Sequence, residues 1–158
     1  MPTSTYVALA TTTLSGGETS FTFSSIPATY RDLVLVTEGT HSSDSGDRFI
    51  RVNGQTTNYS TVSMLGDGSG TSSNTYSLAG MITLAAATAR GSTVIQFMDY
   101  SATDKHKTVL VRGGWAGIAV TAAANRWAST DAISSITLYS STGSFNVGFT
   151  ASLYGISS

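Results

Sequence analysis

The sequence predicts an all-β protein, an antiparallel two-sheet β-sandwich of jelly-roll-like form, with about eight to ten strands in a single domain over residues 1–158. Three observations predict it. Short apolar segments recur at intervals of about ten residues, as in sandwiches and barrels. Serine and threonine number 25 each and glycine 16, a composition typical of short strands joined by tight turns. No segment has a long apolar helical pattern.

The first half of the chain begins with two strands that flank the glycines at positions 16 and 17, a hairpin signal because glycine accepts positive φ. A continuous apolar run then predicts a central strand buried on both faces. Another apolar run follows a polar loop. The four strands expected here are Thr5–Leu14, Glu18–Phe23, Leu33–Val36 and Phe49–Val52.

The second half of the chain contains β-branched and apolar runs separated by turn residues. Ala116–Trp127 stays open between helix and strand, because alanine favours a helix whereas the Gly, Val and Thr residues within it do not. The other strands expected here are Met81–Leu84, Thr93–Tyr100, Thr108–Arg112 and Ile133–Tyr139.

The segment near the carboxyl end has the clearest strand pattern. Its apolar residues alternate with polar or small ones, and successive side chains of a strand point to opposite faces. We therefore expect a last strand over at least Phe145–Leu153, with Phe145, Val147, Phe149 and Leu153 facing the core.

Two polar stretches, Gly39–Asp47 and Gly66–Ser77, are predicted to be exposed loops. They are the candidates for contact with a partner, and Tyr76 is the candidate for an exposed aromatic contact. The individual contact residues that we expect are His41, Asp44, Asp47, Asp67, Ser69, Asn74 and Tyr76.

Catalytic groups are few. His41 lies near Asp44 and Asp47, so a Ser/His/Asp site can be imagined, but serines occur throughout the chain and no G-x-S-x-G elbow positions one of them. Glu18 and Glu38 are the only glutamates, and nothing in the sequence brings two carboxylates together for glycoside hydrolysis. We expect a solvated loop histidine and no enzymatic activity.

Metal and cofactor sites are not expected either. The stretches Asp44–Asp47 and Asp67–Gly70 resemble fragments of calcium loops, but neither continues to a bidentate glutamate. Cysteine is absent, which excludes thiolate ligands and disulfides.

The charges give no case for nucleic acid or membrane as a partner. Eight basic and nine acidic residues are spread along the chain in both signs, with no basic run to neutralise phosphates. No apolar run approaches the length of a membrane-spanning helix.

Three segments together resemble a family of tailed-bacteriophage virion proteins: Phe23–Leu35, Arg51–Ser60 and Phe149–Ile156. The resemblance spans most of the chain and implies a jelly-roll-like sandwich exposed on a virion and assembled as a trimer. On this basis we expect a capsid cement (decoration) protein, made in the host cytoplasm, that binds the outside of the major capsid protein shell. The alternative is a tail or fibre adhesin domain that binds host surface glycans.

A homotrimer is expected on physical grounds as well. The apolar inventory is modest, and many side chains are short and polar, which allows sheets to approach closely. Association would also hide the sheet edges that a lone sandwich must protect.

Overall fold

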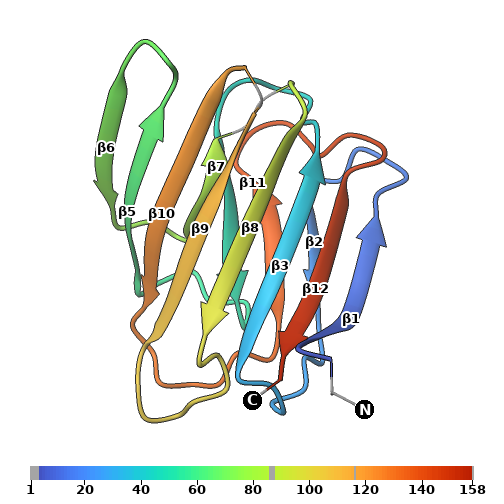
Figure 1. Ribbon diagram of the computed structural model, residues 1–158, viewed down its shortest axis with the longest axis vertical. Helices are drawn as coiled ribbons and strands as arrows, with labels where there is room; N and C mark the ends of the chain where they lie inside the picture. Colours follow the sequence, from blue (N-terminus) through green and yellow to red (C-terminus); the bar gives the residue numbers. More distant parts are fainter. Residues whose placement is uncertain (1–3, 86–87, 116, 158) are drawn as a thin grey trace.

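Two antiparallel sheets, one of eight strands and one of four, pack face to face in the computed structural model, which describes residues 4–85, 88–115 and 117–157, with the backbone alone at 84 and 85 (Figure 1). Within these residues there are twelve strands and no helix. The predicted antiparallel β-sandwich is therefore confirmed.

The larger sheet forms the front layer in Figure 1, and every neighbouring pair in it is antiparallel. In spatial order its strands are β1 (Tyr6–Thr13), β12 (Thr150–Ile156), β3 (Asp32–Gly39), β8 (Gly91–Met98), β9 (Lys107–Trp115), β10 (Ala119–Trp127), β5 (Tyr59–Gly66) and β6 (Thr71–Tyr76).

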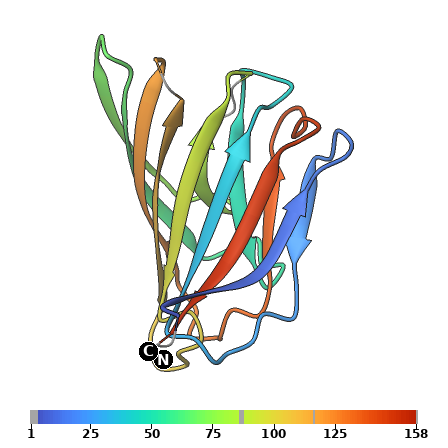
Figure 2. The same cartoon turned by 45° about the vertical axis from the view of Figure 1, so that its right-hand side comes forward.

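The smaller sheet lies behind the larger one, and the chain crosses between the two repeatedly, as in a jelly roll. Figure 2, turned by 45°, shows the β5–β6 hairpin standing away from the rest of the sandwich. In spatial order the strands of the smaller sheet are β2 (Ser20–Phe23), β11 (Ile136–Ser140), β4 (Asp47–Val52) and β7 (Met81–Ala85).

The core lies between the facing surfaces of the sheets, where alternate residues of each strand point inward. β9 and β10 show this period most clearly, because buried and exposed residues alternate along nearly their whole length. β3 is buried on both faces at Leu33, Val34 and Leu35, which confirms the central strand that its continuous apolar run predicts.

Two buried polar side chains tie the layers and loops together. Asn125, on the inner face of β10, accepts a hydrogen bond of 2.6 Å from the Thr61 hydroxyl and donates to the carbonyl of Ile82 across the core, at 3.3 Å. The ammonium of Lys107 is fully buried and donates to three main-chain carbonyls, those of Ala102, Lys105 and Thr130. Asn125 and Lys107 therefore both have the partners that burial requires.

The last strand is shorter than the sequence predicts, because β12 begins at Thr150. Gly148 has a φ of +82°, and the Phe149 amide donates to the Asn146 carbonyl at 3.0 Å, so the chain turns here. Phe145 and Phe149 enter the core from either side of this turn, whereas Val147 at its corner is 70% exposed. The inward assignment was correct for Phe145, Phe149 and Leu153 and wrong for Val147.

The stretch predicted as the loop Gly66–Ser77 is mostly a hairpin. Strand β6 pairs with β5 over six residues, and only the turn at 67–70 is irregular. The ambiguous stretch Ala116–Trp127 is resolved as a strand from Ala119 onward, while residue 116 lies outside the described residues. A search of the described residues finds no helix long and apolar enough to span a membrane.

Candidate functional site

The residues predicted to contact a partner do not form one surface. The loop after β3 and the β5–β6 turn lie at the same end of the sandwich (Figure 1), but the hairpin stands apart from that loop. Asp44, Asp67 and Ser69 are exposed there, as expected, and Asn74 is exposed on strand β6. Tyr76 is only half-buried at the end of β6, so it is a weaker contact than the sequence suggests.

Asp44 and Asp67 both accept hydrogen bonds from main-chain amides. Asp44 accepts a hydrogen bond from the Thr88 amide at 2.6 Å, which lowers the pKa of its carboxyl. The Gly70 amide and the Ser69 amide and hydroxyl donate to Asp67, and these bonds lower its pKa too. The turn at Asp67 is ordinary chemistry for an aspartate beside glycine and serine, whereas the Asp44 bond joins two loops that are distant in the sequence. Within the described residues no three His, Cys, Asp or Glu side chains gather to hold a metal ion.

His41 is fully buried, which corrects the expectation of a solvated loop histidine. Its ring meets Phe145 edge-on at a centroid distance of 5.7 Å. Burial lowers the pKa of His41, and the charge of Arg48 acts in the same direction. Asp47 is also less accessible than expected, since it opens strand β4 and burial raises the pKa of its carboxyl.

Both ring nitrogens of His41 have polar neighbours. Ser140 Oγ lies 2.7 Å from His41 Nε2 and donates to the Thr142 carbonyl at 2.8 Å. Nδ1 lies 3.1 Å from the Ser43 carbonyl oxygen and 3.2 Å from the Ser43 amide nitrogen, so Ser43 offers it both an acceptor and a donor. These contacts fasten the loop after β3 to Ser140 at the end of β11.

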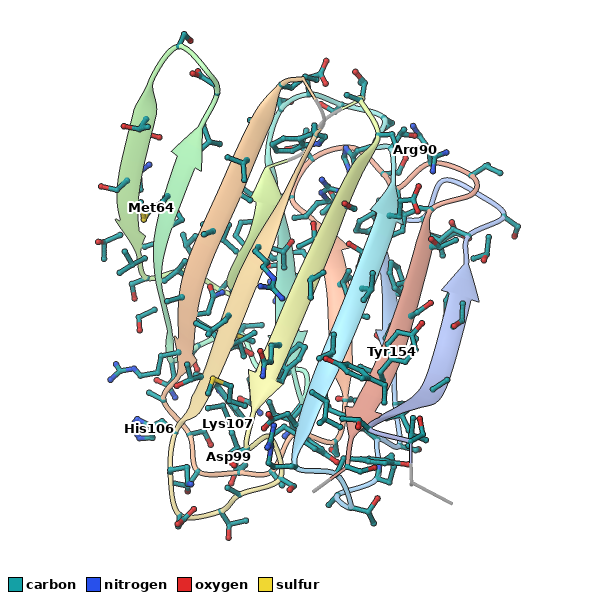
Figure 3. All side chains as sticks on the ribbon, viewed as in Figure 1. Met64, Arg90, Asp99, His106, Lys107 and Tyr154 are labelled. Atoms are coloured by element: carbon teal, nitrogen blue, oxygen red, sulfur yellow. The ribbon has the colours of Figure 1, made fainter. Side chains whose placement is uncertain are left out.

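The most distinctive surface is the outer face of the larger sheet, which points away from the smaller sheet and toward the viewer in Figure 3. Two rows of cross-strand neighbours run across it, mostly aliphatic. One row contains Val34, Gln96, Leu110, Ala124 and Val62. The other contains Val36, Val94, Arg112, Ala122 and Met64.

A groove runs along β10 on this outer face. Ala122 and Ala124 form its floor because their side chains are the shortest in the two rows. Leu110 and Arg112 on β9 form one wall, and the β5 side chains opposite form the other. The hollow has a volume of about 420 Å³, and Met64, labelled in Figure 3, is 64% exposed at its rim.

Arg112 is the only charged residue that lines this groove. It is exposed, and no hydrogen bond or ion pair joins it to another residue in the described part of the chain. An exposed aliphatic surface around one free guanidinium is the arrangement of a docking site more than of a catalytic one. The signal in the sequence was the alternation of β5, β9 and β10, which places these residues outward once the strands are known.

No protein-family model and no curated protein matches the sequence. Among solved structures, the chain is similar to alginate lyase Aly36B in complex with an alginate tetrasaccharide, at 12% identity and a TM-score of 0.33, with 96% of this chain and 70% of that chain covered. It is also similar to a marine alginate lyase from Aplysia kurodai, at 9% identity, a TM-score of 0.35, and 83% and 71% coverage.

A third similar structure is a protein of unknown function from Shewanella oneidensis, at 12% identity, a TM-score of 0.25, and 96% and 76% coverage. The two lyases contradict our expectation of a chain without enzymatic activity, and we withdraw that expectation. At these TM-scores the likeness gives no argument for a particular reaction or substrate.

Proposed function

We propose that this protein is a structural component of a bacteriophage virion, a capsid cement protein that binds the outside of the major capsid protein shell. The observation that carries the proposal is the exposed aliphatic outer face of the eight-stranded sheet. Val62, Met64, Leu110 and Val120 are all exposed on that face. Contiguous apolar surface of this kind on a protein of low charge marks an interaction site.

The polar surroundings fit the same role. Strand β6 borders the apolar rows with serine, threonine and asparagine side chains, all exposed up to Tyr76. A docking surface with an apolar centre and a polar rim holds its partner by shape, hydrogen bonds and bridging water. The resemblance to tailed-phage virion proteins supports placing that partner on a capsid, with a homotrimer as the assembled form.

Co-sedimentation with empty capsids of the encoding phage tests this proposal. The double variant Val62→Ser/Met64→Ser removes two apolar side chains from the outer face, and we expect it to lose most of the binding. Val147→Ser is the matched control, because Val147 is 70% exposed at the turn before β12, outside the two rows. Equal binding of the two variants to capsids would show that the outer face is not the docking surface.

A second candidate function, a tail or fibre adhesin that binds host glycans, is favoured by one observation. Tyr6 and Tyr154 lie together at the β1–β12 edge, with ring centroids 6.5 Å apart and planes at 79°, and Tyr6 is 55% exposed. Exposed aromatic rings are stacking platforms for sugars. Binding to host polysaccharide that disappears in Tyr154→Ala, with capsid binding absent, would favour this candidate over the first.

A further inference from the structure

We propose that the groove along β10 holds an extended segment of a partner protein that presents aliphatic side chains next to a carboxylate, with the carboxylate paired to Arg112. This inference rests on the proposed docking function of the outer face and adds the chemistry of the partner. It follows from the shape of the groove, from the positive charge of Arg112 and from the absence of acidic and aromatic side chains in the groove lining.

The shape follows from residue size along three adjacent strands. Ala124 lies directly between Leu110 and Val62 in the cross-strand register, and Ala122 lies between Arg112 and Met64. Alanine is a poor strand former, so two outward alanines in the middle of a strand give up packing that larger residues would provide. What they leave is a trough along β10, about 420 Å³ in volume and lined mainly by aliphatic side chains.

The charge selects an acidic partner. The lining of the groove contains no carboxylate, so the guanidinium of Arg112 has no counterion within it. A guanidinium offers a planar pair of donors that matches a carboxylate, and the apolar walls would exclude water around such a pair. Gln96, in the neighbouring row, lines the groove as well; its amide nitrogen donates to Asp32 at 3.4 Å, and its amide oxygen can accept from a main-chain N–H of the segment.

Other occupants fit less well. A glycan would need an aromatic platform, and no aromatic side chain lines this groove. A fatty acid would need a pocket that encloses most of its surface, whereas this groove is open along the sheet. A second copy docked by the same groove would bring two Arg112 side chains onto one apolar surface with no acid from the lining of either groove.

The test uses the whole protein and two synthetic pentapeptides, acetyl-Val-Leu-Asp-Val-Leu-amide and the same peptide with Asn in place of Asp. Methyl NMR spectra are recorded during titration to millimolar peptide. We expect the acidic peptide to shift the methyl signals of Met64, Leu110 and Ala122, and the asparagine peptide to bind about tenfold more weakly or worse.

Three variants complete the design, and all three sites are exposed strand positions that leave the core intact. Arg112→Gln is expected to remove the preference for the acidic peptide, and Ala122→Leu to abolish binding of both peptides by filling the trough. Arg126→Gln is the matched control, an exposed arginine on β10 that does not line the groove, and it is expected to bind as the unaltered protein does.

Absence of any shift at these methyls, equal binding of the two peptides, or an undiminished acidic preference in Arg112→Gln would each overturn the proposal. Concentration-dependent self-association that buries Met64 would overturn it in favour of a second copy. Capsid co-sedimentation is measured separately with the unaltered protein. If that protein binds capsids but neither peptide, the groove chemistry is wrong and the proposed function stands.

Discussion

At the scale of single residues, His41 shows how position in space overrides position in sequence. Its neighbours in the chain are serines and aspartates, which predict a hydrated loop. Its neighbours in the fold are Phe145 and Ser140, which come from the far end of the chain. Only the pairing of the loop with the segment before β12, seen in the bridge between His41 and Phe145, makes the ring a buried one.

His41 should make stability depend on pH. Burial lowers its pKa in the folded state below the value of about 6.5 in an unfolded chain, so the unfolded state binds more protons as the pH falls. We expect the free energy of unfolding to be highest above pH 6.5 and to decrease below it, by at most about 1.4 kcal/mol per pH unit for one proton.

Urea unfolding at several pH values between 5 and 8 measures this slope. The variant that tests the assignment is His41→Gln, which should flatten the slope. A slope that survives in His41→Gln would assign the dependence to another group.

Phe149 tests the packing of the turn before β12. Its side chain is 1% exposed and its ring lies 4.7 Å from that of Phe145, so Phe149→Ala should lower the free energy of unfolding by roughly 3–5 kcal/mol. The exposed Val147 provides the comparison, and Val147→Ala should change stability by less than about 0.5 kcal/mol. Similar losses from the two variants would contradict the turn geometry.

At the scale of elements, the sequence predicts the strands that bury alternating apolar residues and misses those that do not. β6 contains only polar residues and Tyr76, because both of its faces are in contact with solvent. Its sequence therefore resembles that of a loop. β10 is rich in alanine because its outer face forms the groove floor, which removes the usual propensity signal.

The residues of the candidate site were out of reach for the same reason. Arg112 and Met64 are unremarkable in the sequence, and they become neighbours of Ala122 only through the β5–β10–β9 register. That register depends on long-range pairing, which no local pattern encodes.

Asn125 tests how the β10 element is fastened to the core. Asn125→Ala leaves the Thr61 hydroxyl and two main-chain carbonyls, those of Ile82 and Val109, without their side-chain partner. We expect a loss of about 1–3 kcal/mol in the free energy of unfolding.

The matched variant is Thr61→Val, and the double variant completes a cycle. A coupling energy near zero between the two sites would contradict the 2.6 Å hydrogen bond as a stabilising contact.

At the scale of the whole molecule, the predicted homotrimer concerns what covers the exposed surfaces. The sandwich leaves the edge strand β6 and the aliphatic outer face open to solvent. Light scattering of the purified protein at micromolar concentration should give the mass of three chains. A stable monomer at this concentration would contradict the predicted homotrimer.

Deleting residues 68–73 tests the part of the assembly that the polar hairpin provides. This change removes the β5–β6 turn and half of β6, which lie away from the core. We expect the shortened protein to fold and to bind empty capsids more weakly, measured by co-sedimentation. Unchanged binding would show that the hairpin has no role in capsid binding.

The most direct test of the account is hydroxyl-radical footprinting of the protein on intact virions compared with the free protein. The central claim is that the outer face of the eight-stranded sheet is covered by the shell, so Met64 should be strongly protected on the virion. Val147, which is 70% exposed in the free protein against 64% for Met64 but lies outside that face, should be oxidised at the same rate in both states. Equal oxidation of Met64 in the two states, or absence of the chain from virions, would contradict the claim.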